Sequence, residues 1–345
     1  MKTLAAVLTK INNDLRIEEL TLPELRPGQV LTQVAFSGLC HSQLNEIQGL
    51  KGKDKYLPHT LGHEGSGIVE AIGDGVKKVK PGDHVVLTWI KGTGADIPSA
   101  SYTRRDGTVV NSGAIATFLT KAVISENRVV KIPTAMPLDL AALLGCAIST
   151  GMGTVKNIAK TKKGDSLAVF GIGGVGLAAV HAASILGAAL VIAIDVKATK
   201  LKNAKELGAT HLIDASHSKI ADAIMEITHG KGVDYAIECA GIADSMETAF
   251  CCVRNHGGQA IIVGNLPKDA KITIDPFMLI NGKGIVGSWG GATDPDIDIP
   301  FYVQLFLEGK LKLDKMLTHR FPFQNINEAF IKLAKGAMGR GVIKF

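Results

Sequence analysis

Cysteine is scarce in this sequence, and its distribution does not suit a disulfide framework. The 345 residues include only five cysteines, an odd number at scattered positions: Cys40, Cys146, Cys239, Cys251 and Cys252. Proteins that depend on disulfides are cysteine-dense and usually carry an even number. The pattern therefore indicates a reducing compartment. We expect a cytoplasmic protein in which some thiols are free to bind metal.

The sequence also lacks a concentrated basic region. Lysine and arginine number 38 against 32 aspartates and glutamates, a net charge of 38 − 32 = +6, with the two signs interspersed. No block of Lys and Arg alternates with aromatic residues, which argues against a nucleic-acid partner. A mildly positive field remains compatible with an anionic small-molecule cofactor or substrate.

Long apolar segments are few, and two of them bear on membranes. The stretch at residues 4–8 is too short for the apolar part of a secretory signal peptide. The run at 167–194 is long enough to span a bilayer, but it contains five glycines, and lysines flank both of its ends. It also divides into strand-like, helix-like and strand-like parts. We therefore expect a buried strand–helix–strand unit and no membrane partner.

Apolar residues are abundant and support a large core. They make up 46% of the chain, with 20% charged residues and a mean hydropathy of +0.21. At about 150 residues per domain, the length suggests two domains. Residues 1–147 consist of short β-branched runs broken by Pro-Gly and Asp-Gly turns, and the tail at 289–345 is mixed. The first of these segments predicts a compact β-rich or barrel-like domain.

Residues 148–288 alternate apolar strands with helices. The predicted strands lie at 166–170, 190–194, 211–213, 233–237, 260–263 and 284–288, and the predicted helices at 175–186, 198–207, 219–228 and 243–253. Six apolar strands with intervening helices are typical of a doubly wound parallel sheet. The fold class is therefore α/β, with a six-stranded dinucleotide-binding domain of the Rossmann type beside the β-rich domain.

A glycine-rich turn follows the first of these strands. Residues 171–176 match G-x-G-x-x-G at the start of a helix, where backbone N–H groups and the helix dipole favour a pyrophosphate. Asp195 lies 19 residues after the motif, at the end of the next strand, and can accept both hydroxyls of a ribose. This favours NAD, while Lys197 and Lys200 nearby leave NADP open. The alternative is a structural turn without a ligand.

A cysteine, a histidine and a distant cysteine indicate a metal site. Cys40 follows a predicted strand, His63 opens the next hairpin, and Cys146 lies where the β-rich part ends. These three side chains would give zinc three protein ligands and leave a fourth position for water or substrate. Taken singly, the cysteines are equally compatible with core packing and the histidine with a hydrogen-bonded turn. The other three cysteines are interpreted as core residues.

Four motifs in fixed order resemble one family over the whole chain, with a gap near 90–112. They are Cys40-His41-Ser42, Gly62-His63-Glu64, Cys146 with Ser149-Thr150-Gly151, and the glycine turn at 171–176. Together they are similar to the zinc-dependent medium-chain alcohol dehydrogenases. The resemblance implies a GroES-like catalytic domain at 1–147 and 289–345 and a Rossmann NAD-binding domain at 148–288.

The resemblance also implies roles for individual residues. Cys40, His63 and Cys146 would bind one catalytic zinc, with Glu64 as an alternate or outer ligand that takes part in catalysis. Ser42 would accept the substrate proton, and Trp89 would form a wall of the substrate pocket. The residues implied in cofactor binding are His41, Thr150, Gly171, Gly173, Gly174, Val175, Gly176, Asp195, Lys200, Val263 and Arg340. Among them, His41 and Arg340 would contact the pyrophosphate.

Three departures from the family pattern bear on zinc and on the proton path. The segment at 90–112 lacks the four cysteines of a structural zinc lobe, so we expect no structural zinc. Gln43 replaces the common aspartate that orients the histidine ligand, and a neutral amide raises the basicity of that histidine less. Asn45 replaces a histidine that ends the proton relay in some members, which leaves His41 or water as the exit.

The resemblance implies hydride transfer between a small alcohol, or an aldehyde or ketone, and NAD(H). One alternative is zinc-assisted reduction of a conjugated C=C or C=N bond, against which Ser42 argues. Another is a non-catalytic NAD-binding scaffold, against which the retained ligand set argues. The family analogy further predicts a homodimer or homotetramer formed through the last Rossmann strand, at 285–288.

Overall fold

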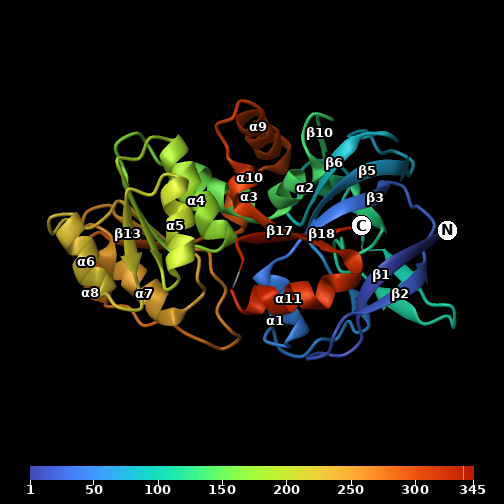
Figure 1. Cartoon of the computed structure of the whole chain (residues 1–345), viewed down its shortest axis with the longest axis horizontal. Coiled ribbons are helices and arrows are strands. Elements are labelled where there is room, and N and C mark those ends of the chain that lie inside the picture. Colours follow the sequence, from blue (N-terminus) through green and yellow to red (C-terminus); the bar gives the residue numbers. More distant parts are fainter. Residues whose placement is uncertain (99, 337) are drawn as a thin grey trace. The chain divides into compact units, whose positions relative to one another are not determined.

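The computed structural model describes residues 1–98, 100–336 and 338–345. The chain divides into two compact units (Figure 1). The first comprises Met1–Cys146, Asp294–Gly309 and Met316–Phe345, and the second comprises Ala147–Thr293 and Lys310–Lys315.

The first unit is built on a closed barrel and a seven-stranded sheet. Short strands rich in valine, isoleucine and threonine form both, as their β-branched side chains favour. The barrel runs in the order β1 (Lys2–Leu8), β2 (Arg16–Thr21), β7 (Ser101–Thr103), β8 (Val109–Asn111) and β4 (His59–Thr60). The sheet runs in the order β10 (Val129–Ile132), β6 (His84–Thr88), β5 (Glu64–Ile72), β3 (Gln29–Gly38), β18 (Arg340–Lys344) and β17 (Leu317–Pro322), and β9 (Lys121–Ser125) also pairs with β3.

Short helices complete the first unit. They are α1 (His41–Ile47), η1 (Glu126–Arg128), α2 (Leu138–Ala141), η2 (Ala142–Gly145), α9 (Pro295–Leu307), η5 (Phe323–Asn325) and α11 (Ile326–Ala334), and α10 (Leu313–Met316) ends in this unit. One apolar cluster of the unit includes Leu39, Leu61 and Phe330. It therefore anchors the segments just before Cys40 and His63, as well as α11.

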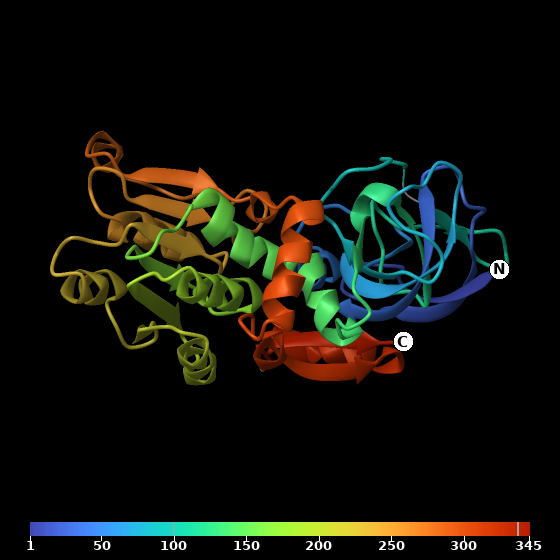
Figure 2. The ribbon, with the colours of Figure 1, turned by 90° about the horizontal axis from the view of Figure 1, so that it is seen from above.

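The second unit is a six-stranded parallel sheet with helices on both faces (Figures 1 and 2). The strand order is β13 (His211–Asp214), β12 (Leu190–Asp195), β11 (Ser166–Phe170), β14 (Tyr235–Glu238), β15 (Gln259–Ile262) and β16 (Gly284–Gly287). The helices are α3 (Ala147–Gly153), the π-helical turn η3 (Thr154–Ile158), α4 (Gly174–Ile185), α5 (Ala198–Glu206), α6 (Ile220–Ile227), α7 (Ala243–Cys252), α8 (Pro276–Ile280) and η4 (Gly290–Ala292). All five strand pairings are parallel, which confirms the predicted doubly wound sheet.

Several helices of the first unit have no counterpart in the sequence prediction, and α1 and α9 are the two longest of them. The helix α1 has only seven residues and a polar sequence, so it shows little periodicity. The helix α9 contains Pro300, a residue that usually ends a helix, and begins with Pro295. Pro295 is compatible with helix because it follows the N-cap Asp294, where a missing N–H costs nothing.

Two carboxylates hold the segment at 90–112, where the sequence lacks the four cysteines of a structural zinc lobe. Glu126, which is 4% exposed, accepts hydrogen bonds from the backbone N–H groups of Lys77, Lys78 and Ala95 at 2.6, 2.9 and 2.9 Å. Asp296 accepts from the N–H and hydroxyl of Thr93 at 2.6 and 2.7 Å. Burial alone would raise the pKa of the Glu126 carboxyl, but the three backbone donors hold that pKa below its usual value. The segment is thus fixed by anionic oxygens.

Replacing Glu126 by Gln should destabilise this unit by about 2 kcal/mol, because a buried charged acceptor of three N–H groups becomes a neutral amide. Since the pKa of Glu126 is lower in the folded state, its contribution is present at neutral pH and is lost as the pH falls. Urea unfolding should therefore show a difference in the free energy of unfolding between wild type and Glu126→Gln that disappears at acidic pH. The matched control is Glu19→Gln, which removes an exposed carboxylate paired with Lys2 and should change little.

No single helix among the described residues is long and apolar enough to cross a membrane. One pair of helices, Leu138–Gly145 and Ala147–Ile158, is long and apolar enough for a span when the two are taken together, but the pair is bent by 56°. Most of the residues in this pair are buried within the protein. The run at 167–194 forms β11, α4 and β12, as predicted for a strand–helix–strand unit.

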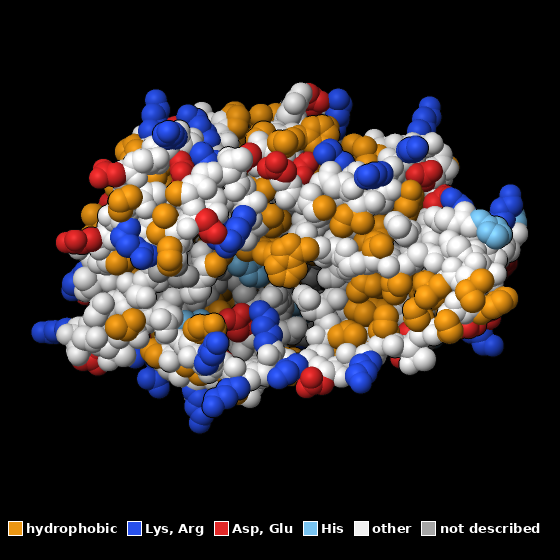
Figure 3. Space-filling model, turned by 180° about the vertical axis from the view of Figure 1, so that it is seen from behind, with side chains coloured by type: hydrophobic (Ala, Val, Ile, Leu, Met, Phe, Trp, Pro, Cys, Tyr) orange, Lys and Arg blue, Asp and Glu red, His pale blue; other side chains and the backbone are white. Residues whose placement is uncertain are grey.

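On the face shown in Figure 3, basic and acidic side chains are intermixed.

Candidate functional site

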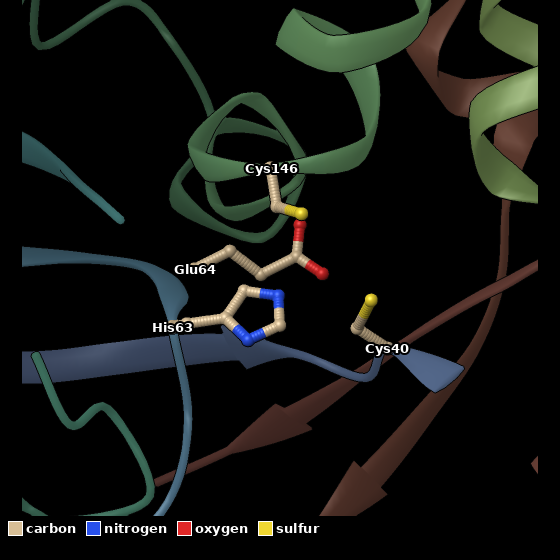
Figure 4. Close-up of side chains that lie close together, drawn as sticks. All are labelled: Cys40, His63, Glu64 and Cys146. Atoms are coloured by element: carbon tan, nitrogen blue, oxygen red, sulfur yellow. The ribbon is translucent and has the colours of Figure 1, made fainter. Parts of the chain in front are cut away.

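Four side chains from three distant segments of the first unit converge (Figure 4). Cys40 lies directly before α1, His63 and Glu64 lie at the start of β5, and Cys146 follows η2. One ligand atom from each, two sulfurs, an imidazole nitrogen and a carboxylate oxygen, lies within 4.8 Å of all the others. The structure therefore brings together all four metal-binding residues expected from the sequence.

Glycines permit this close approach. Gly62 has a φ of +95°, and a Cβ there would lie 2.4 Å from the Thr117 hydroxyl oxygen. A Cβ on Gly145 would lie 2.3 Å from the carbonyl oxygen of Leu87. Contacts this short exclude any side chain. His63 and Cys146 each follow one of these glycines directly, so the two segments approach closely because the preceding residues have no side chains.

The two cysteines and the histidine are electrostatically coupled. A hydrogen bond between the thiols, opposed for Cys40 by burial, lowers the pKa of Cys40 and raises that of Cys146, because the two sulfurs share one proton. Burial alone would lower the pKa of His63, but the negative charge on Cys40 raises it. The cluster therefore favours a thiolate at Cys40, the form in which cysteine binds a divalent cation, while binding of that cation would require His63 to be neutral.

The carboxylate of Glu64 has a second partner. Arg340, the first residue of β18, donates through Nη2 to Glu64 Oε1, and the two residues are 5% and 0% exposed. Burial raises the pKa of Glu64, while the charge of Arg340 acts in the opposite direction. The predicted pyrophosphate contact thus lies against a residue of the metal cluster. These two residues are 276 positions apart, and no sequence signal indicates the pair.

The donor set fits zinc. Thiolate sulfur, imidazole nitrogen and carboxylate oxygen are its preferred ligands, and three ligands with an open fourth position are typical of catalytic sites. Cys40, His63 and Cys146 supply the three, while Glu64 is held by Arg340. The arrangement therefore suits a metal that accepts an exchangeable ligand.

The other predicted site residues of this unit lie close to the cluster in sequence. Within α1, His41 is exposed, Ser42 is half-buried and Gln43 is buried. Gln43 Oε1 accepts a hydrogen bond from the backbone N–H of Cys40 at 3.2 Å, so it fixes the loop of a cysteine rather than the histidine. Trp89 follows β6, is half-buried, and its carbonyl accepts from Arg128.

The second unit contains the predicted phosphate-binding turn. The N–H of Gly171 donates to the carbonyl of Ile194 at 2.8 Å, and α4 begins directly after Gly173. A Cβ on Gly176 would lie 2.0 Å from the oxygen of Gly171, whereas one on Gly173 would meet nothing within 4 Å. A Cβ on Gly171, whose φ is +83°, would lie 2.8 Å from Ala240. The motif therefore has two glycines required by backbone conformation or packing and one that leaves the backbone open to a ligand.

Asp195 is tied to this turn. It is 8% exposed at the end of β12, and it accepts the N–H of Ile172 at 2.8 Å and the N–H of Lys197 at 3.0 Å. Lys200 Nζ lies 3.5 Å from its Oδ2. The predicted ribose acceptor and the glycine turn are therefore parts of one hydrogen-bonded arrangement.

The remaining cofactor candidates are spread over the second unit. Thr150 lies in α3 and is 7% exposed, and its hydroxyl has no hydrogen-bond partner within the part of the chain that the structure describes. Val175 and Gly174 lie in the first turn of α4. Val263 follows β15 and donates its N–H to the carbonyl of Glu238 at 2.9 Å. A buried unpaired hydroxyl is uncommon, so Thr150 supports a ligand contact.

Comparison with family models gives two matches. Residues 26–134 match the model described as an alcohol dehydrogenase GroES-like domain, and residues 174–307 match a zinc-binding dehydrogenase model. The two matches cover most of the chain and include Cys40, His63, Glu64 and the start of α4.

Known proteins are similar over the whole length. Alcohol dehydrogenase 1 of Solanum tuberosum is 34% identical over 366 residues, which span 98% of this chain and 96% of that protein. A crystal structure of an alcohol dehydrogenase zinc-binding domain protein from Burkholderia ambifaria has a TM-score of 0.93 at 33% identity, covering 100% of this chain and 99% of the other. Benzyl alcohol dehydrogenase from Acinetobacter calcoaceticus has a TM-score of 0.91 at 31% identity, with the same coverage.

Proposed function

Because the chain belongs to the zinc-binding alcohol dehydrogenase family and is thereby an oxidoreductase, we propose that it transfers a hydride between an alcohol, or the matching aldehyde or ketone, and NAD(H). The observation that carries this proposal is the convergence of Cys40, His63 and Cys146, with Glu64, on one point. A scaffold without catalysis has no need of that donor set.

The chain's own residues supply binding and proton transfer. When bound, zinc supplies Lewis-acid polarisation of the substrate oxygen, and the nicotinamide supplies the hydride acceptor. We assign the half-buried hydroxyl of Ser42, two residues after Cys40, to receive the proton that the alcohol releases. Trp89 is assigned to the wall of the substrate pocket, and the unpaired hydroxyl of Thr150 to the nicotinamide side.

We propose NAD rather than NADP as the cofactor. Asp195 carries a negative charge at the end of β12, where it would accept ribose hydroxyls and repel a 2′-phosphate. Its carboxylate already contacts the glycine turn through Ile172, which supports a shared cofactor site. His41 and Arg340 are assigned to the pyrophosphate.

A screen of NAD reduction over alcohols and polyols tests the proposal, with benzyl alcohol included because a similar structure is a benzyl alcohol dehydrogenase. We expect turnover with at least one alcohol, about one zinc per chain, loss of turnover on chelation and recovery on adding Zn²⁺. Turnover of conjugated alkenes or imines alone would favour the reductase alternative. No zinc and no turnover in any substrate class would leave only the scaffold.

We also propose that the protein forms at least a dimer through β16. This strand pairs only with β15, at the end of the sheet order, and so leaves an open edge in the described chain. Nearby in sequence, Phe277, Ile280 and Trp289 are exposed by 61%, 77% and 81%. An open strand edge beside large apolar side chains favours pairing with a second copy. Light scattering should give a mass of at least twice 36.3 kDa.

A reducing compartment, the cytoplasm, is the proposed location. All five cysteines are free thiols in the structure. Cys40 and Cys146 are the proposed zinc ligands and require reduced sulfur. The proposal therefore rests on the chemistry of these thiols.

A further inference from the structure

A second group of metal-ligating side chains lies outside the candidate zinc centre. Glu46 near the end of α1, Asp54 in the following loop and His59 at the start of β4 present one ligand atom each, all within 4.8 Å of one another. His59 Nε2 lies 2.7 Å from Asp54 Oδ2 and 3.8 Å from Glu46 Oε1. The side chains of His59, Asp54 and Glu46 are 6%, 12% and 31% exposed. His59 and Asp54 are therefore largely shielded from solvent, while Glu46 is partly exposed.

The orientation of His59 determines what this pocket can bind. Its other nitrogen, Nδ1, lies 3.1 Å from the carbonyl oxygen of Thr60. A carbonyl only accepts hydrogen bonds, so Nδ1 carries a proton, and Nε2 is the nitrogen that can bind a cation when it carries none. Nε2 faces two carboxylates, and its 2.7 Å contact with Asp54 Oδ2 requires either a proton or a bound cation between the two atoms. A histidine that donates one N–H to a carbonyl and directs the other nitrogen at carboxylates has the arrangement of a metal ligand.

The local charge also favours a cation. The two carboxylates contribute two negative charges, and Lys51 Nζ, 2.8 Å from Glu46 Oε2, neutralises one of them. Glu46 Oε1 remains directed toward His59. Lys51 is therefore a partial competitor for the metal, because it occupies one of the carboxylate oxygens but leaves the other available.

We propose that Glu46, Asp54 and His59 form a second divalent-cation site, distinct from the cysteine cluster. One imidazole nitrogen and two carboxylate oxygens suit Mn²⁺ or Zn²⁺ better than Ca²⁺ or Mg²⁺, which prefer all-oxygen sites. Three protein ligands leave further positions to water. The site is independent of the proposed hydride transfer.

The residues of this second site lie on the same two segments as Cys40 and His63. Cys40 precedes α1 and Glu46 lies six residues later, about 9 Å along a helix. His59 and His63 likewise lie four residues apart on the segment that joins β4 to β5. A cation at the second site would therefore tie together the same two segments that carry two of the zinc ligands.

The test is a titration with Mn²⁺ of protein that carries one equivalent of Zn²⁺, which the thiolates of the cysteine cluster retain, followed by the loss of the free Mn²⁺ signal in electron paramagnetic resonance. We expect one Mn²⁺ per chain in the wild type. Asp54→Asn should weaken that binding at least about ten-fold, since even the loss of an outer partner of a metal site has an effect of this size. Lys51→Met should strengthen it by up to about five-fold, because it removes the competing ammonium. Zinc content should be equal in all three proteins.

The matched control is Glu19→Gln, which removes a carboxylate from an exposed ion pair elsewhere in the same unit. It should leave Mn²⁺ binding unchanged. The proposal is overturned if the wild type takes up no Mn²⁺, or if neither Asp54→Asn nor Lys51→Met changes the affinity. Either result would show that Glu46, Asp54 and His59 are only hydrogen-bond and ion-pair partners of one another. Because Lys51 is half exposed, the Lys51→Met test holds even where Asp54→Asn is poorly folded.

Discussion

Replacing Cys40 by Ser should remove most of the zinc and lower kcat/KM about a thousand-fold. A serine hydroxyl is not deprotonated near neutrality, so the cluster loses the thiolate that its coupling to Cys146 favours. Lewis-acid stabilisation of several kcal/mol then disappears, and each 1.36 kcal/mol corresponds to a factor of ten in rate. Metal analysis and steady-state kinetics with the substrate found in the screen measure the two effects.

The matched control for this variant is Cys251→Ser. Cys251 lies in α7 of the second unit, is half-buried, and belongs to no metal-ligating group in the described residues. The Cys251→Ser variant should therefore retain both its zinc and its turnover. If Cys40→Ser kept its zinc and its rate, the converging side chains would not be a metal centre, and the proposed chemistry would have no basis.

Replacing Asp195 by Ala should raise the KM for NAD about 10- to 100-fold and narrow the preference for NAD over NADP. Each hydrogen bond to a charged group contributes about 1.5–3 kcal/mol, and the ribose hydroxyls lose theirs. The KM for NADP should change little or fall, because the charge that repels a 2′-phosphate is gone. Initial rates with both cofactors give the ratio.

A carboxylate on the neighbouring strand provides the control for Asp195. Asp214 pairs in register with Asp195 at the same end of the sheet, but in the described contacts its carboxylate accepts hydrogen bonds only from Ser216. Asp214→Ala should leave both KM values unchanged. Because Asp195 also binds Ile172 and Lys197, Asp195→Asn serves as a second variant that keeps an acceptor for these backbone groups. Equal KM values for NAD in wild type and both Asp195 variants would contradict the assignment.

The second unit was largely predictable from sequence because each of its elements is marked locally. The strand Ser166–Phe170 is a continuous apolar run, and Gly187 and Gly208 each follow a helix. The predicted bounds of α4 and α5 agree with the structure within one residue at each end. The helix α9 was missed because Pro300 lies inside it, and a lone proline signals an interruption rather than a helix.

The ligand set was predictable in part, and its surroundings were not. Cys40, His63 and Cys146 were found through motifs that resemble a family. Their spacing alone was equally compatible with core cysteines and a hydrogen-bonded turn histidine. The contact of Arg340 with Glu64 depends on β18 lying next to β3 in the sheet, and such a long-range pairing leaves no local pattern. The hydrogen bond from Cys40 to Gln43 depends on where a short helix begins, which a polar seven-residue stretch does not reveal.

The carboxylates Glu126 and Asp296 make the order of the segment at residues 90–98 independent of the proposed zinc. They hold the backbone near Thr93 and Ala95 with oxygen atoms that neither a chelator nor an oxidant removes. Stripping the zinc should consequently produce an inactive apoprotein whose flank at residues 90–98 stays ordered. Such a protein is expected to regain its activity when metal is returned, without having to refold that flank.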